Sequence, residues 1–263
     1  MESSYLDDLK AENAAFAEKS DRALRSLFSA AKEKNEVQFA IALNPEFRGM
    51  QDAGWSGAED TLRAFDDYAE FLDGGELTSL KARAALSFYC HLSEASGHYE
   101  VPKNMLRILD GESYSIIPFK DLVEKHRKTG NAISPNSNKI IRDLVGHAKN
   151  LGLEELADTF ANAFDPEIRN GYAHADYVVW EDSLRLPMRN GGNGRKIPWV
   201  EFFILYERGI GFFERLQNLR HESILQYTEP KTVIGSINNI DKPGKCVIHA
   251  DPIKRTFSVR FGG

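Results

Sequence analysis

The sequence predicts a mainly α-helical protein: a helical bundle with a β-hairpin insertion and a small C-terminal antiparallel β appendage. Apolar residues recur at helical spacing through most of the 263 residues. Helix-start signals precede several of these stretches, among them the capping box Ser56-x-x-Glu59 and the pair Asp165-Pro166. Alternating apolar and polar residues, which are typical of strands, are found mainly around residues 178–186 and beyond residue 229.

Helical periodicity begins in the N-terminal region, from Tyr5 to about Lys34. Residues 37–43 fit either a strand or a helix. Proline and glycine residues predict a loop over residues 44–55. The capping box then opens a helix that ends near Leu72, before a Gly-Gly pair.

Several helices are expected in the middle of the chain. The stretch from about Thr78 to Ala95 is apolar nearly all round, which predicts a buried helix. Residues 98–103 interrupt the pattern. Further helices are expected at residues 105–109, 119–128, 136–151 and 153–163. In this interpretation the run Lys125-His126-Arg127-Lys128 is the basic last turn of its helix.

Strands and one long helix are expected toward the C-terminus. A hairpin is predicted from Val178 through residues 184–186, followed by a flexible stretch at 190–194. Pro198 opens the longest apolar-rich helix, from Trp199 to about Tyr227. Residues 232–234, 245–249 and 256–261 alternate as in a small antiparallel sheet.

These elements suggest three segments, which differ in charge. They are an acidic N-terminal helical extension (residues 1–75), a helical bundle (76–228) and the C-terminal β appendage (229–263). The net charge is −6, but the chain up to Glu76 holds 17 acidic and 8 basic residues, whereas the remainder holds 22 and 25. The acidity therefore lies in the N-terminal part, and a local basic surface elsewhere is compatible with the composition.

Composition narrows the class of protein. With 42% hydrophobic residues and a mean hydropathy of −0.42, the chain reads as an ordinary soluble protein. We expect a cytoplasmic location and no membrane contact, because there is neither a signal-peptide pattern nor an apolar stretch of membrane-spanning length. Two distant cysteines and histidines without metal-ligand spacing predict no disulfide, metal or cofactor. The histidines expected to be structural or at the surface are His91, His98, His126, His147, His221 and His249.

The stretch from Phe164 to Trp180 holds the strongest concentration of chemically useful residues. Asp165 is a predicted N-cap and Pro166 a first helical residue, so one short helix should carry Arg169, Asn170 and His174. After His174 the sequence turns to β-branched and aromatic residues, which predict a strand.

Arg169-Asn170-Gly171-Tyr172-Ala173-His174, followed by Ala175-Asp176-Tyr177, resembles the motif of the HEPN superfamily (higher eukaryotes and prokaryotes nucleotide-binding domains). The resemblance implies a bundle of four or five helices with the motif on the last but one. The predicted helices that begin near residues 78, 136, 153 or 166, and 199 fit this plan. It also implies a homodimer with a composite active site, since catalytic members of the family are dimers of this kind.

On an ideal helix Arg169 and His174 point about 140° apart, whereas Asn170 and His174 share a face. Two copies facing each other across a twofold axis would bring both pairs into one cleft. Such a cleft suits metal-independent RNA cleavage. We cast His174 as general base or acid, Arg169 as clamp for the phosphate and the transition state, and Asn170 as an orienting hydrogen-bonding group.

Other residues near the motif are candidates for substrate binding. Tyr177 is expected to stack on a base or to line the cleft. A basic group is expected either to guide the RNA backbone or to form a solvated hairpin tip. Its members are Arg185, Arg189, Arg195 and Lys196.

The leading hypothesis is a dimeric, metal-independent endoribonuclease of the kind that HEPN proteins contribute to toxin–antitoxin systems and phage defence, with an antitoxin or regulatory protein as a further partner. The alternative is a non-catalytic HEPN module that binds RNA, a nucleotide or a protein partner. A third interpretation is a plain helical scaffold, in which Arg169 pairs with a carboxylate such as Asp165 or Asp176 and His174 caps or packs at the helix end.

Overall fold

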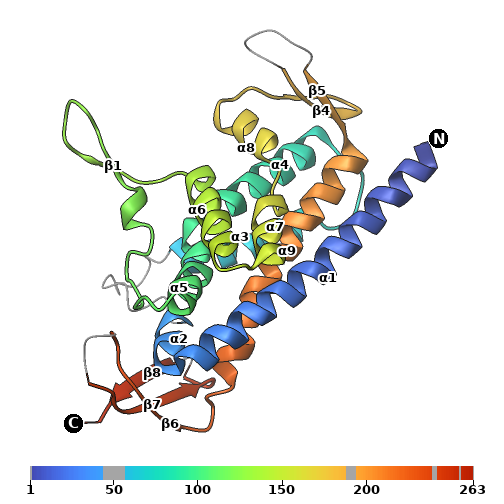
Figure 1. Cartoon of the computed structure of the whole chain (residues 1–263). Coiled ribbons are helices and arrows are strands. Elements are labelled where there is room, and N and C mark those ends of the chain that lie inside the picture. The colour runs from blue at the N-terminus through green and yellow to red at the C-terminus, as the bar shows by residue number, and fades with distance from the viewer. Residues whose placement is uncertain (1, 44–56, 188–193, 239–241, 255, 263) are drawn as a thin grey trace.

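The computed structural model describes residues 2–43, 57–187, 194–238, 242–254 and 256–262. It is mainly helical with small antiparallel sheets, which confirms the predicted fold class at this level (Figure 1). The α-helices are α1 (Glu2–Lys34), α2 (Glu36–Leu43), α3 (Gly57–Leu72), α4 (Ser79–Glu94), α5 (Glu100–Leu109), α6 (Ser137–Asn150), α7 (Glu154–Asn162), α8 (Pro166–Ala173) and α9 (Trp199–Leu225). The 3₁₀ turns are η2 (Ser96–Tyr99) and η3 (Lys120–Leu122). The strands are β1 (Glu124–Lys125), β2 (Ala132–Ile133), β3 (Val178–Val179), β4 (Ser183–Leu186), β5 (Arg195–Pro198), β6 (Lys231–Gly235), β7 (Gly244–Asp251) and β8 (Thr256–Phe261).

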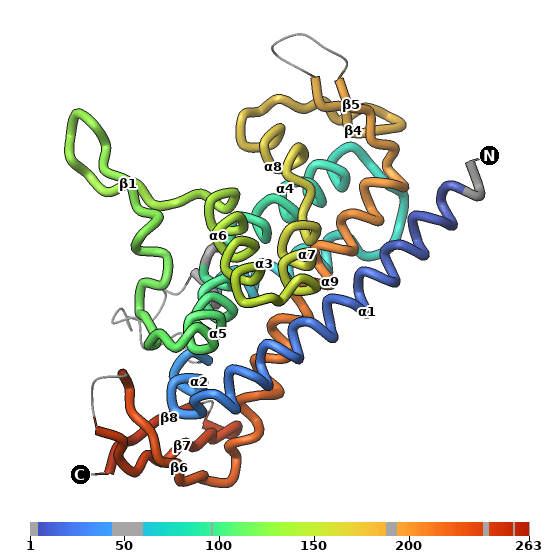
Figure 2. Tube along the Cα trace, in the orientation of Figure 1, coloured from blue at the N-terminus to red at the C-terminus, as the bar shows by residue number. Residues whose placement is uncertain are grey.

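α1 and α9 lie side by side along much of the molecule (Figures 1 and 2). They run in the same direction, because their polar contacts advance in step along both helices. These contacts join Tyr5 to Glu201, Asn13 to Arg208, Arg25 to Glu222 and Lys32 to Gln226. α1 also packs on α5 and α7, so the N-terminal helix is an integral part of the bundle.

One hydrophobic core includes residues from all three predicted segments, for example Leu27, Phe88 and Ile248. Tyr89 of α4 lies near its centre and contacts Phe164 edge-on at 5.3 Å between ring centroids. Whether residues 1–75, 76–228 and 229–263 are separate domains stays a prediction. The N-terminal helix and the bundle nevertheless exclude water from the same interior.

α2 settles the alternative that the sequence left open at residues 37–43, since it is a helix whose residues after Glu36 are all buried. The sheet β6–β7–β8 is antiparallel, as predicted, and packs against α2. Gly235 of β6 lies so close to Val37 that a Cβ atom at residue 235 would stand 2.4 Å from the valine Cγ2. A glycine is therefore needed for the sheet to approach the helix.

The predicted helix at residues 119–128 is wrong. Only the turn η3 is helical there, and residues 124–133 form the β1–β2 hairpin. Gly130, with φ at 72°, permits the tight turn, and its N–H donates to the carbonyl of His126. The interruption predicted at 98–103 is also wrong in part, because α5 begins at Glu100 with Pro102 in its first turn, where a missing N–H costs nothing.

The remaining helices agree with the predicted elements within a few residues. The hairpin expected after the motif is a three-stranded antiparallel sheet, β3–β4–β5, which leads directly into α9. The loop at 44–55, the cap Ser56 and most of the stretch 190–194 lie outside the described residues. No helix within the described ranges is long and apolar enough to cross a membrane.

Candidate functional site

The helix that carries the motif begins as predicted. Asp165 is the N-cap of α8, and its side chain accepts hydrogen bonds from the N–H groups of Glu167 at 2.9 Å and Ile168 at 3.0 Å. Pro166 occupies the first turn. The N–H of Asp165 donates to the Tyr89 hydroxyl at 2.7 Å, which ties the start of α8 to the buried helix α4.

The end of α8 is a Schellman-type turn centred on Ala175. Ala175 has φ at 53°, its N–H donates to the carbonyl of Tyr172, and the N–H of Asp176 donates to the carbonyl of Gly171 at 2.7 Å. Gly171 faces β4, where an added Cβ would stand 2.8 Å from Leu186 Cδ2. His174 is the C-cap residue, so the turn fixes the backbone of the predicted catalytic histidine.

Arg169 points into the bundle toward the first turn of α6. The residue is 5% exposed, and its guanidinium donates to Ser137 Oγ at 3.0 Å and to Asn138 Oδ1 at 2.6 Å. Its Nε is buried without a hydrogen-bond partner among the described residues. Within that part of the chain no carboxylate forms an ion pair with Arg169. Arg169 is connected to a carboxylate only indirectly: the Ser137 hydroxyl accepts from Arg169 and donates to Glu94.

Asn170 and His174 form the exposed part of the motif. The side chain of Asn138 donates to Asn170 Oδ1 at 2.9 Å, so Asn138 connects the buried Arg169 to the surface. The N–H of His174 donates to the carbonyl of Asn170 at 3.1 Å, which places the two residues one helical turn apart. The structure thus brings Arg169 and Asn170 together through Asn138, with His174 on the adjoining surface.

Among the described residues Arg169 pairs with neither Asp165 nor Asp176, since its guanidinium binds Ser137 and Asn138. Asp165 binds Arg195 at 2.7 Å instead of Arg169. His174 is exposed rather than buried against a carboxylate, although it does cap the helix end.

Tyr177 is half-buried and stacks on Tyr172, with ring centroids 5.6 Å apart and planes inclined by 20°. The Tyr172 hydroxyl is in turn hydrogen-bonded to Ser87 of α4 at 2.9 Å. One face of the Tyr177 ring is therefore covered within the chain, which leaves less of it to stack on a base.

The basic residues predicted to guide RNA are neutralised by nearby carboxylates. Arg195 contacts Asp165 and Glu167, at 2.7 and 2.9 Å. Lys196 binds Asp182 at 2.7 Å, and hydrogen bonds from Lys196 and Ser183 lower the pKa of Asp182 to about 2.

Arg185 lies opposite Lys196 on the neighbouring strand, 3.5 Å from Asp182 and over the ring of Trp180. The fourth predicted residue, Arg189, lies outside the described residues. The β4–β5 sheet thus presents paired charges where free cations were expected.

Sequence reasoning missed Ser137 and Asn138. The polar run Asn136-Ser137-Asn138 at the start of α6 was the available signal, and Asn136 is indeed the N-cap. Nothing in the spacing shows that the next two side chains turn toward a residue 32 and 31 positions later.

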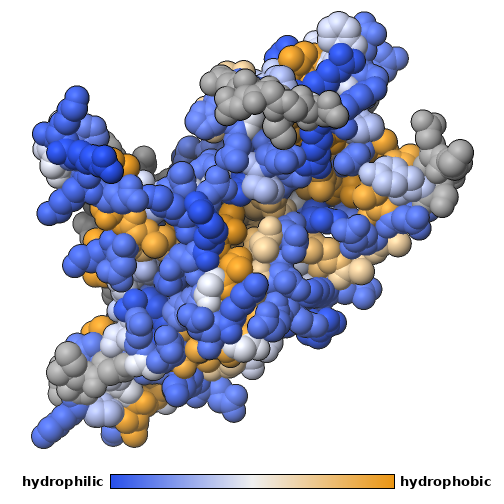
Figure 3. Space-filling view, turned by 45° about the horizontal axis from the view of Figure 1, so that its top comes forward, coloured by the Kyte–Doolittle hydropathy of each residue, from blue (hydrophilic) through white to orange (hydrophobic). Residues whose placement is uncertain are grey.

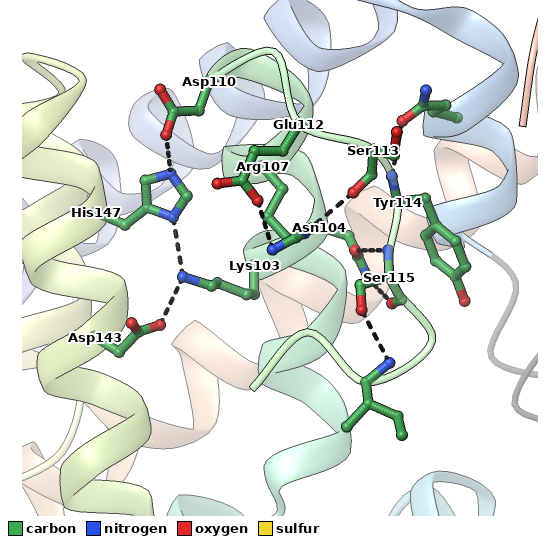
Figure 4. A network of polar contacts seen from close by, with 12 residues as sticks. Lys103, Asn104, Arg107, Asp110, Glu112, Ser113, Tyr114, Ser115, Asp143 and His147 are labelled. Carbon is green, nitrogen blue, oxygen red and sulfur yellow. Dashed lines mark hydrogen bonds and ion pairs between the residues drawn. The ribbon is translucent and has the colours of Figure 1, made fainter. Parts of the chain in front are cut away.

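A second polar network lies between α5 and α6 (Figure 4). Lys103, 8% exposed, extends its ammonium group to Asp143 Oδ2 at 2.7 Å and to His147 Nδ1 at 3.0 Å. His147 Nε2 lies 3.3 Å from Asp110. Burial and the charge of Lys103 lower the pKa of His147, so that its neutral form accepts from the lysine. This confirms a structural place for His147.

In the described residues no three His, Cys, Asp or Glu side chains are gathered so that they could hold a metal ion. No protein-family model matches this chain, and neither a curated protein nor a solved structure was found to match it. The likeness to the HEPN superfamily therefore rests on the residues around Arg169 and His174 alone.

Proposed function

We propose that the protein is a metal-independent endoribonuclease of HEPN type, acting as a homodimer in a toxin–antitoxin or phage-defence setting. The observation that carries the proposal is the hydrogen-bonded series Arg169–Asn138–Asn170, which ends at the surface beside the exposed His174. It places a positive charge and an amide group beside an imidazole, and these are groups that RNA transesterification can use.

In this reaction the 2′-hydroxyl of a ribose attacks the adjacent phosphorus, and the bond to the 5′-oxygen of the next nucleotide breaks. A base must take the 2′-hydroxyl proton and an acid must give a proton to the leaving oxygen. The products are a 2′,3′-cyclic phosphate and a 5′-hydroxyl end. The imidazole of His174 would perform one of these two proton transfers. A second copy of His174 across a twofold axis would supply the other, which is why the proposal includes a dimer.

Arg169 would act on the phosphate from beneath the surface. Its charge lies in the protein interior, where screening by salt is weak, so its field reaches the surface around Asn170. Its hydrogen bond to Asn138 also holds Asn138 against Asn170. A direct contact between Arg169 and a phosphate oxygen, as the motif suggests, would require the contacts with Ser137 and Asn138 to open.

The second candidate function is a non-catalytic module of the same type, which binds RNA, a nucleotide or a protein partner. The observation that favours it is the burial of Arg169, since both terminal nitrogens of the guanidinium are already used inside the chain. In this case Arg169 only stabilises the packing of α8 on α6.

The deciding experiment is cleavage of RNA by purified protein in EDTA, with analysis of the product ends. We expect cleavage by the wild type that leaves cyclic phosphate ends, and a loss of at least about 100-fold with His174→Ala, the size of a general acid–base contribution. His221→Ala is the matched control, because His221 is also exposed and on a helix.

Cleavage that survives His174→Ala in full would contradict the proposal. No cleavage by a folded wild-type dimer would favour the non-catalytic module. Equilibrium sedimentation of the same samples tests the dimer, and a monomer at micromolar concentration would count against a composite site.

A further inference from the structure

The β1–β2 hairpin projects from the body of the molecule (Figures 1 and 2). Its strands pair Glu124 with Ile133 and Lys125 with Ala132. The turn between them is closed by hydrogen bonds from the N–H of His126 to the carbonyl of Asn131 and from the N–H of Gly130 to the carbonyl of His126. This ordered arm is where the sequence had predicted a helix end.

The arm carries cations that no carboxylate in the described part of the chain contacts. Lys125, Arg127 and Lys128 are exposed, and none of them forms an ion pair with a carboxylate of the described residues. The cations of the β4–β5 sheet, in contrast, are held by Asp165, Glu167 and Asp182. In Figure 3 the arm is the hydrophilic lobe on the left. An anionic ligand that binds here would not have to displace a carboxylate of the described residues.

The base of the arm is fixed next to the candidate site. Glu124 of β1 forms an ion pair with Lys139 in the first turn of α6. β2 leads through three residues to Ser137 and Asn138, which bind Arg169. The five Cα–Cα steps from Ala132 to Ser137 span at most about 17 Å. One bound RNA strand can therefore contact both the arm and the candidate site, because binding sites for single-stranded nucleic acid cover roughly 4 to 16 nucleotides.

We propose that the β1–β2 arm binds the phosphate backbone of single-stranded RNA through Lys125, Arg127 and Lys128 and leads the strand to the surface around Asn170 and His174. This inference rests on the proposed function for the identity of the ligand. The chemistry of the tip favours RNA over a membrane, since residues 125–131 include no apolar side chain that could enter a bilayer.

The test is RNA binding by the full-length His174→Ala protein, which is used so that the probe stays intact. The probe is a labelled single-stranded RNA of about 20 nucleotides, longer than typical binding sites. Affinity is measured over a series of salt concentrations for this background and for the same background with Lys125→Gln, Arg127→Gln and Lys128→Gln. The matched control removes three exposed lysines elsewhere, Lys10→Gln, Lys242→Gln and Lys245→Gln.

We expect the arm variant to bind about 100-fold more weakly at 0.1 M salt, because three phosphate contacts with a salt slope of about 0.7 each contribute roughly fivefold apiece. The slope of log K against log salt is negative, and its magnitude should decrease by about 2. The control should keep both values near those of the background. Since the three side chains are exposed, circular dichroism of the arm variant should match the background.

An unchanged affinity and slope in the arm variant would overturn the inference, as would binding of anionic phosphatidylserine vesicles by a protein that binds no RNA. Failure of the proposed function is a separate result. If the arm variant loses RNA binding while the wild type never cleaves RNA, the arm inference stands and the catalytic proposal falls. If RNA is cleaved in a His174-dependent way but the arm variant binds RNA as well as the background does, the catalytic proposal stands and the arm inference falls.

Discussion

Two cations are buried in this bundle, and α6 holds both of them in different ways. Lys103 reaches the middle of α6, where Asp143 lies 2.7 Å away and balances its charge. Arg169 reaches the first turn of α6, where neutral oxygens of Ser137 and Asn138 accept its hydrogen bonds. A buried charge without a counter-ion is costly. The difference separates a cation in direct contact with a carboxylate from one that reaches a carboxylate, Glu94, only through the Ser137 hydroxyl.

The largest expected loss of stability is that of a substitution at Lys103. Lys103→Met removes the cation that offsets Asp143 and should lower the free energy of unfolding by about 3 kcal/mol, the low end for a broken buried ion pair, since Asp143 keeps some contact with water. Urea denaturation measures this. Lys149→Met, an exposed change on α6, the helix that carries Asp143, is the control and should stay within about 0.5 kcal/mol. A loss under 1 kcal/mol would mean that Asp143 does little to compensate Lys103.

The corresponding change at the motif should cost less stability. Arg169→Met loses two hydrogen bonds, each worth about 1 kcal/mol, but it also removes a buried charge that no described carboxylate contacts directly. We expect a net loss of about 1.5 kcal/mol in urea denaturation, together with loss of RNA cleavage. If Arg169→Met destabilises the protein as much as Lys103→Met does, the two cations contribute equally to stability, which would contradict the distinction drawn between them.

A smaller effect should come from the turn that ends α8. Ala175 holds a left-handed conformation that costs a residue with a Cβ atom about 1 kcal/mol. Ala175→Gly should therefore raise the free energy of unfolding by up to about 1 kcal/mol, seen as a higher melting temperature. Ala173→Gly, an exposed substitution in the last turn of the same helix, should lower it instead. Stabilisation by both would indicate that general flexibility, not relief at Ala175, is the cause.

The smallest expected effect is a pH dependence confined to the Lys103 side. The pKa of His147 is lowered in the fold, so the unfolded chain binds more protons at acidic pH, and the stabilisation present above the ordinary histidine pKa is lost as the pH falls through the folded-state value. Stability in urea should drop from pH 7.5 to pH 5.5, and His147→Gln should reduce that drop. An equal drop in the variant would assign it to other groups.

How much the sequence could predict depended on the range of the interactions. Asp165 and Pro166 define the start of α8 by contacts within three residues, and that prediction is confirmed. The hairpin at 124–133 was missed because a basic run fits a helix end as well as a turn, and Gly130 decides between them through its positive φ. The partners of Arg169 lie on another helix, so only the packing of α8 on α6 reveals them.

The same limit applies to surface charge. The sequence suggested that Arg185, Arg195 and Lys196, with Arg189, either guide an RNA backbone or form a solvated hairpin tip. Strand register and the approach of β5 to α8 bring acidic residues to Arg185, Arg195 and Lys196. Lys125, Arg127 and Lys128 were assigned to a helix end, and the turn exposes them instead. Counting basic residues in a sequence therefore predicts a cationic surface poorly until the positions of the carboxylates are known.

The parallel pair of α1 and α9 affects the order in which the protein can be completed during synthesis. Its polar contacts join residues 194 to 197 positions apart. At a translation rate of about 5 to 20 residues per second, α1 is made roughly 10 to 40 s before its partner. Until then the side of α1 that α9 will cover remains open to chaperones or to other nascent chains. α1 is thus synthesised long before α9 encloses it.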